Sequence, residues 1–143
     1  MKTIVLRIGG QRFVARLLEA EAPKTCAAFL ARLPIEGSVI HARWSGESVW
    51  FPMDGVGIDA PAENQTSHPS RGDLLYYPGG ISEKELLITY GSALFSSKVG
   101  QLQGNHFAVV TEGLDRLPEI GRKASGRAPR RSGSKPNAPI LLF

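Results

Sequence analysis

The fold is decided by three segments that follow one another along the chain: APKTCAAFLARL at 22–33, GDLLYYP to ELLITYG across 72–91, and HFAVVTEGLDRL at 106–117. The first predicts a helix, because Pro23 suits the first helical turn, where its missing N–H would have no partner. Its apolar residues recur at helical spacing and form one face: Cys26, Phe29, Leu30 and Leu33. The other two segments are rich in β-prone residues. The sequence therefore places a helix within a mainly β pattern.

Outside these segments, alternation and turn residues predict further strands. Thr3–Ile8 and Gln11–Leu18 flank Gly9–Gly10 and form a hairpin, since glycine tolerates the positive φ angles of tight turns. The other expected strands cover 39–44, 47–51, 73–77, 85–90 and 106–111, the last leading into a short helix near Gly113. Long polar connections cover 52–71 and 91–105. About seven strands with two helices predict an antiparallel barrel or sandwich.

Two of these motifs are similar to those of a known family. The first helix approximates P-K-T-x-x-N-F-x-x-L through Pro23, Lys24, Thr25, Phe29 and Leu33, and Glu112-Gly113-Leu114 matches an E-G-hydrophobic helix start. The chain thus resembles the cyclophilin-like family over roughly residues 1–120. Gly72-Asp73, Tyr77-Pro78 and Tyr90-Gly91 look most like its small uncharacterised bacterial and archaeal branch. The resemblance implies a mainly β, cyclophilin-like antiparallel β-barrel of about seven to eight strands with two helices.

The residues that a prolyl isomerase of this family needs are largely replaced. Arg43 lies one residue out of step with the family's His-Arg pair, and Ala28 replaces the asparagine of the helix motif. The stretch Q-G-G-D is absent near Val49–Met53, and Q-F-F is replaced by Glu85-Leu86-Leu87. Peptidyl-prolyl isomerisation or proline-peptide binding is therefore the alternative function, and catalysis of any kind stays open.

The charge is divided unevenly along the chain. Of 17 Lys and Arg residues, six lie in residues 122–143, which contain no acid, so the first 121 residues carry a net charge of −2. We expect residues 1–121 to form the barrel and 122–143 to form a basic, Gly/Ser/Pro-rich flexible tail with an apolar end. Weak contact of 122–135 with nucleic acid or an acidic surface would make the protein an interaction module. The apolar end, 138–143, would dock on a neighbouring subunit of a homo-oligomer or on the body's own groove, or be dispensable.

Composition predicts a cytoplasmic protein. The N-terminal residues lack the apolar core of a signal peptide, and no run approaches the ~20 apolar residues of a membrane span. The one cysteine, Cys26, lies on the apolar helix face and is expected to be a buried, inert thiol. His41, His68 and His106 are too dispersed for a metal motif. We expect neither a metal nor a cofactor.

The best candidate for a functional site centres on Arg43. Alternation puts His41 and Arg43 on one strand face, and a guanidinium beside an aromatic residue is a good receptor for a carboxylate or phosphate. Apolar walls would come from Trp50, Phe51, Tyr77 and Tyr90. The sequence therefore predicts a groove for a small anionic organic ligand. The alternative is that these aromatic residues fill the core and that Arg43 pairs with Glu47. Trp44 is placed in the core with Ile40 and Ala42.

Weaker candidates lie elsewhere. Glu47 would act as a general base if desolvation raised its pKa, or would be a solvated turn residue. His106 would be a general acid–base or a structural histidine. A polar cluster in the long connection would fold over a ligand or remain a solvated loop: Glu63, Asn64, Gln65 and His68.

Overall fold

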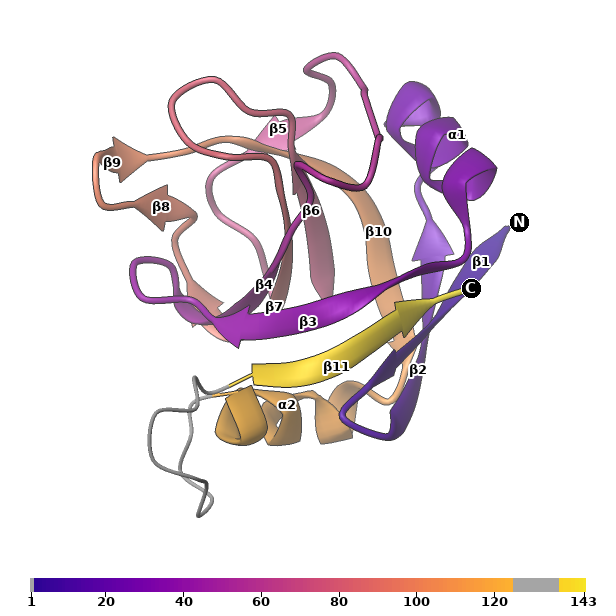
Figure 1. Ribbon diagram of the computed structural model, residues 1–143, viewed down its shortest axis with the longest axis vertical. Helices are drawn as coiled ribbons and strands as arrows, with labels where there is room; N and C mark the ends of the chain where they lie inside the picture. The colour runs from indigo at the N-terminus through magenta and orange to yellow at the C-terminus, as the bar shows by residue number, and fades with distance from the viewer. Residues whose placement is uncertain (1, 125–136) are drawn as a thin grey trace.

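The computed structural model, which describes residues 2–124 and 137–143, is an antiparallel β-barrel with two α-helices (Figure 1). Eight strands close the barrel in the order β2, β1, β11, β3, β4, β7, β6 and β10, with β10 pairing back to β2. Their bounds are Thr3–Ile8 (β1), Gln11–Leu17 (β2), Ile35–His41 (β3), Gly46–Pro52 (β4), Asp73–Tyr77 (β6), Glu85–Ala93 (β7), Gly104–Glu112 (β10) and Asn137–Leu142 (β11). The predicted mainly β, cyclophilin-like barrel is confirmed.

Short elements complete the fold. An additional strand, β5 (Gln65–Thr66), pairs with β10, and β8 (Ser96–Ser97) pairs with β9 (Gly100–Gln101) in a small separate ribbon. The connections predicted at 52–71 and 91–105 therefore contain short strands, and β7 runs to Ala93 rather than ending at Tyr90. The hairpin between β1 and β2 is confirmed, with positive φ angles at Gly9 and Gly10.

The helices cover opposite sides of the barrel (Figure 1). Helix α1 (Pro23–Arg32) buries Cys26 and Phe29 in the main core, where the Phe29 ring stacks on Phe107 with centroids 4.3 Å apart. Helix α2 (Leu117–Ala124) follows a short 3₁₀ turn (Leu114–Arg116) and contributes Leu117, Ile120 and Ala124 to the same core. In the part of the chain that the structure describes, no helix is both long enough and apolar enough to span a membrane.

The C-terminal segment belongs to the barrel and not to a tail. Strand β11 lies between β1 and β3, and pairs with both. Its residues Ala138, Ile140 and Leu142 are buried, because alternate side chains of a strand point to the same face. Residues 122–124 end α2. Of the interpretations for the apolar end, docking on the body itself describes residues 137–142, while the basic residues between 125 and 136 lie outside the described residues.

The expectation for Trp44 was wrong. Strand β3 ends at His41 and the chain bends over residues 43–45, so the alternation that put Trp44 beside Ala42 stops before it reaches the indole. Trp44 is 54% exposed, and the Arg43 guanidinium lies over its ring at 5.6 Å from the centroid. Both side chains therefore project from the turn between β3 and β4.

A second apolar cluster lies on the outer face of β6 and β7. Leu75, Tyr77 and Leu87 of these strands point away from the main core. They pack with Phe95 and Leu102 of the segment that follows β7, and with Trp50. The segment around β8 and β9 thus folds back over the outside of the barrel. This overlay creates the concave surface in which the candidate site lies.

Candidate functional site

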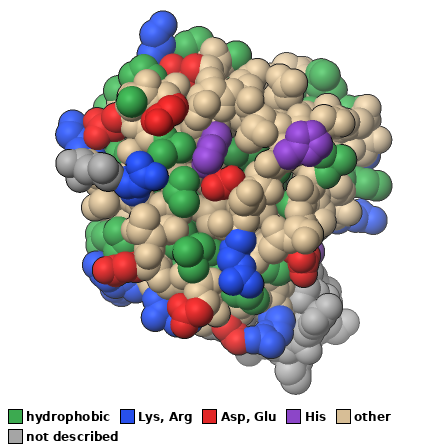
Figure 2. All heavy atoms as spheres, turned by 180° about the vertical axis from the view of Figure 1, so that it is seen from behind, with side chains coloured by type: hydrophobic (Ala, Val, Ile, Leu, Met, Phe, Trp, Pro, Cys, Tyr) green, Lys and Arg blue, Asp and Glu red, His purple; other side chains and the backbone are tan. Residues whose placement is uncertain are grey.

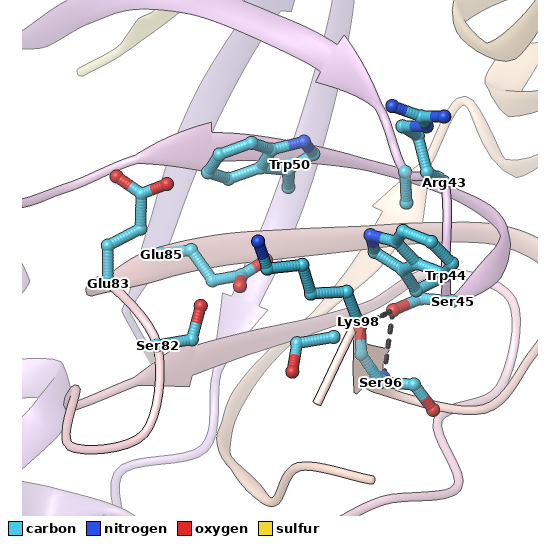
Figure 3. Close-up of a pocket in the computed structure, with 11 residues that line it drawn as sticks. Arg43, Trp44, Ser45, Trp50, Ser82, Glu83, Glu85, Ser96 and Lys98 are labelled. Carbon is cyan, nitrogen blue, oxygen red and sulfur yellow. Dashed lines mark hydrogen bonds between the residues drawn. The ribbon is translucent and has the colours of Figure 1, made fainter. Parts of the chain in front are cut away.

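A pocket of about 250 Å³ opens beside this second cluster (Figure 3). Its walls come from the β3–β4 turn, from the residues that lead into β7, and from β8 and the residue after it. The lining combines two indoles, four charged side chains and four serines, the first two groups being Trp44, Trp50, Arg43, Glu83, Glu85 and Lys98. Such a mixture of aromatic and charged groups in a concavity is typical of a small-molecule site.

Glu85 lies at the start of β7, and pairs there with Tyr77 of β6 and Pro52 of β4. Its side chain shares the outer face of β7 with Leu87, so it points away from the main core. Only 8% of Glu85 is exposed, although it lines the pocket. In Figure 3 the carboxyl group lies at the centre of the pocket.

The electrostatics of Glu85 are unusual for a carboxyl group. Burial, with a smaller contribution from the negative charge of Glu83, raises the pKa of Glu85 from 4.5 to about 8. Among the described residues its carboxyl group forms no ion pair and no hydrogen bond with another side chain. At neutral pH the group is therefore held mainly in its protonated form, facing the pocket.

Arg43 lies on the opposite side of the pocket from the two acids, whereas the Lys98 side chain extends toward them. In Figure 3 the Arg43 guanidinium extends from the rim away from both carboxyl groups, whereas Glu83 lies beside Trp50 and Glu85 lies below it. The Lys98 side chain crosses the pocket toward Trp50. The pocket is thus electrically two-sided and can receive a molecule that carries both an anionic and a cationic group.

Two of the predicted binding residues, Arg43 and Trp50, meet in this pocket, but His41 and Tyr90 pair with each other elsewhere. The His41 Nε2 atom lies 2.6 Å from the Tyr90 hydroxyl, and Nδ1 lies 2.9 Å from the Ala42 carbonyl oxygen. A Cβ atom on Gly121 of α2 would lie only 2.3 Å from the Tyr90 ring, so the helix backbone covers this tyrosine. The His41–Tyr90 pair thus sits beneath α2.

Phe51 and Tyr77 do not line the pocket that contains Arg43 and Trp50. Phe51 points into the main core and is 3% exposed. Tyr77 lines a neighbouring concavity of about 550 Å³ together with Gln65. Its hydroxyl accepts hydrogen bonds from the backbone N–H groups of Ile81 (3.0 Å) and Ser82 (3.3 Å), which orders the β6–β7 loop. Tyr77 therefore belongs to the neighbouring concavity and not to the lining of the pocket that contains Arg43 and Trp50.

The weaker candidates are engaged with the backbone or with other side chains. Glu47 is exposed and accepts a hydrogen bond from the Ser92 N–H. Glu63 accepts hydrogen bonds from the N–H and hydroxyl of Thr25, in the first turn of α1. Asn64 Nδ2 donates a hydrogen bond to the His106 carbonyl oxygen, and Gln65 Nε2 donates one to the Gln103 carbonyl oxygen. The His106 Nε2 atom lies 3.1 Å from Asp73 Oδ1. His68 is exposed on the same connection. The contacts of Glu63, Asn64 and Gln65 hold the long connection against α1 and the β10 region.

Sequence reasoning missed Glu85, Glu83 and Lys98. The signal available for Glu85 was an acid at the start of an apolar strand, ELLITY, in a register that alternates with core residues. That pattern also describes a solvated outer face. Only the overlay of residues 94–102 buries it, and the sequence did not predict that overlay.

Two observations concern metal sites among the described residues and the charge on one face of the molecule. No group of three or more His, Cys, Asp or Glu residues in the described ranges could hold a metal ion. On the described part of the face in Figure 2, Lys and Arg side chains are interspersed with Asp and Glu, and no broad area of one charge is visible.

Comparisons with known proteins show the fold and the family. No curated protein matched the sequence. McbB, solved in complex with tryptophan, is similar with a TM-score of 0.74 and 19% sequence identity, covering 97% of this chain and 43% of McbB. The chain thus spans less than half the length of McbB. The hypothetical protein AF2241 from Archaeoglobus fulgidus is similar with a TM-score of 0.60 and 18% identity over 98% of this chain and 92% of that one.

A cyclophilin-type peptidyl-prolyl cis-trans isomerase from Cryptosporidium parvum, solved in the presence of the dipeptide Ala-Pro, has a TM-score of 0.57 and 12% identity over 99% of both chains. At these identities the likeness concerns the fold alone, and it confirms the cyclophilin-like resemblance. The family model described as "Protein of unknown function (DUF3830)" matches residues 4–135. The chain belongs to the DUF3830 family.

Proposed function

We propose that the protein binds a small organic molecule in the pocket between the β3–β4 turn and β8, with an anionic group of that molecule held by Arg43 and Lys98. The single observation that carries this proposal is Glu85, a buried carboxyl group without a partner that faces a pocket. A buried carboxyl group destabilises a fold unless it is paired. Its position beside an open concavity is a reason to expect a ligand there, because functional sites commonly hold such perturbed groups.

The lining supports the class of ligand. Guanidinium and ammonium groups bind carboxylates and phosphates through charge-assisted hydrogen bonds, and Trp50 with Trp44 offers flat apolar surfaces for a ring or a chain. The volume of about 250 Å³ lies just below the range of roughly 300–1,000 Å³ typical of drug-sized sites. A metabolite of amino-acid size suits this space. The structural neighbour McbB, whose complex contains tryptophan, supports a ligand of this size.

Two other functions from the sequence have less support. For prolyl isomerisation, Arg43 would have to face a substrate proline. In this structure its guanidinium stacks on Trp44 at the rim, and the aromatic residue Phe51 lies in the core. For an interaction module that acts through the basic segment, most of that segment lies outside the described residues and the idea stays a prediction.

We expect Arg43→Ala to weaken binding of an anionic ligand at least tenfold, because a charge-assisted hydrogen bond contributes about 1.5–3 kcal/mol. A thermal-shift screen with carboxylate, phosphate and amino-acid metabolites identifies the ligand. At 100 times its dissociation constant it stabilises the fold by about 2.7 kcal/mol, a shift of several degrees.

Arg71→Ala is the matched control for this experiment. Arg71 is exposed, carries the same charge and lies outside the pocket lining. The proposal is contradicted if a ligand binds Arg43→Ala and the wild type equally well, or if no compound of the panel shifts the wild-type melting temperature.

A further inference from the structure

We propose that Glu85 recognises an organic ammonium group, so that the ligand of the pocket is an amino-acid-like zwitterion whose binding releases one proton to the solvent. This inference rests on the proposed function and deepens it by naming the class of ligand. The protonated carboxyl group of the empty pocket loses its proton to solvent, and the resulting carboxylate pairs with the ammonium group. The charge on the ligand does not change, so one proton is released for each molecule bound.

Glu85 places an unpaired carboxyl group at the pocket. Glu85 is 8% exposed as a residue, its carboxyl group is directed into the pocket, and that group has no ion-pair or hydrogen-bond partner among the described residues. A carboxylate in such surroundings needs a cation to compensate its lost hydration. The described residues do not provide that cation, because no ion pair joins Glu85 to Lys98 or to any other cation among them.

The groups around Glu85 favour a cation at this point of the pocket. Glu83 lies on the same side of the pocket and adds negative charge, while the Trp50 ring lies above the Glu85 carboxyl group in Figure 3. A cation at this point gains from two acids and from the negative face of an indole. The opposite rim carries Arg43, which suits a carboxylate. An α-amino acid carries both groups on one small molecule.

The groups that face Glu85 set how its binding depends on pH. The charged groups that line the pocket with Glu85 are Arg43 from the β3–β4 turn, Glu83 from the residues before β7, and Lys98 from the β8–β9 turn, and Tyr77 of β6 is its titratable cross-strand neighbour. None of the residues that line the pocket is a histidine. Because burial raises the pKa of Glu85 to about 8, the proton must be displaced at any lower pH. The affinity for an ammonium ligand should therefore rise about tenfold per pH unit between pH 6 and pH 7.

The test is isothermal titration calorimetry with matched probes in two buffers that both work at pH 6.5 and differ in ionisation enthalpy, PIPES and ACES. The first probe is L-tryptophan, and the second is indole-3-propionate, which keeps the ring and the carboxylate but lacks the amine. L-Phenylalanine and 3-phenylpropionate form a second pair. We expect each amino acid to bind at least tenfold more tightly than its amine-free partner and to release about one proton per site at pH 6.5.

Glu85→Gln should abolish the proton release and reduce amino-acid affinity at least tenfold, so that each amino acid loses its advantage over its amine-free partner. Glu21→Gln, at an exposed position outside the pocket, is the control and should behave as the wild type does. If the amine-free acids bind as tightly as the amino acids, or if no proton is released, the ammonium inference is overturned and the anion pocket stands. If neither kind of probe binds, both this inference and the proposed function fail.

Discussion

At pH 9 the Glu85→Gln variant is expected to have a free energy of unfolding several kcal/mol larger than that of the wild type. At pH 4 the two free energies should differ little. The folded-state pKa of about 8 lies above the value of 4.5 that applies when the group is exposed. The folded protein therefore holds a proton that the unfolded chain has lost, and wild-type stability falls as the pH rises from 4.5 to 8. Each pKa unit corresponds to about 1.4 kcal/mol, which gives a total on the order of 5 kcal/mol.

Urea unfolding of the wild type and of Glu85→Gln at a series of pH values measures this effect. The informative quantity is the difference between the two unfolding free energies, because the other titrating groups cancel in it. The difference should grow with pH through this interval and level off above pH 8 to 9. Glu21→Gln, which is exposed, should follow the wild type at every pH. A difference for Glu85→Gln that does not change with pH would mean that the carboxyl group is not buried in the folded protein.

Leu142→Asp is expected to unfold most of the protein at neutral pH. Leu142 is fully buried in the core from β11, a strand that closes the barrel between β1 and β3. The substitution removes a buried leucine, which costs about 2–5 kcal/mol, and adds an unpaired carboxylate in an apolar environment. Since a domain has roughly 5–15 kcal/mol of total stability, the folded fraction should fall sharply.

Leu141→Asp is the matched control, because it introduces the same charge one residue earlier on the opposite, partly exposed face of β11. Circular dichroism and thermal unfolding should give a folded Leu141→Asp variant and a largely unfolded Leu142→Asp variant. If both variants unfold with the melting temperature of the wild type, residues 137–142 are not part of the barrel.

The sequence predicted the elements whose signal is local. The hairpin follows from two glycines between β-prone runs, and α1 follows from Pro23 and an apolar face with helical spacing. Strand β11 could not be predicted in the same way. The stretch NAPILLF is short, contains Pro139 and follows a basic segment, and its partners β1 and β3 lie about a hundred residues or more away. Strand pairing over such separations leaves no local pattern.

The sequence anticipated only part of the lining of the candidate pocket, for a related reason. Arg43 and Trp50 were expected in one groove and do line one pocket. Alternation gave the two faces of each strand, but it could not say which face lies inside the barrel or which outer residues the β8–β9 segment covers. Glu85 was therefore overlooked, and Trp44 was assigned to a core that its strand does not reach.

The most direct measurement is a carbon-13 NMR titration of the glutamate carboxyl groups in the intact protein. The account predicts one carboxyl resonance with a pKa of about 8 that is missing from Glu85→Gln. It also predicts that saturation with L-tryptophan shifts this titration to lower pH, because the bound ammonium group favours the carboxylate. Titration of every glutamate near its ordinary pKa would contradict a buried, unpaired carboxyl group at the pocket, and with it the basis for the proposed site.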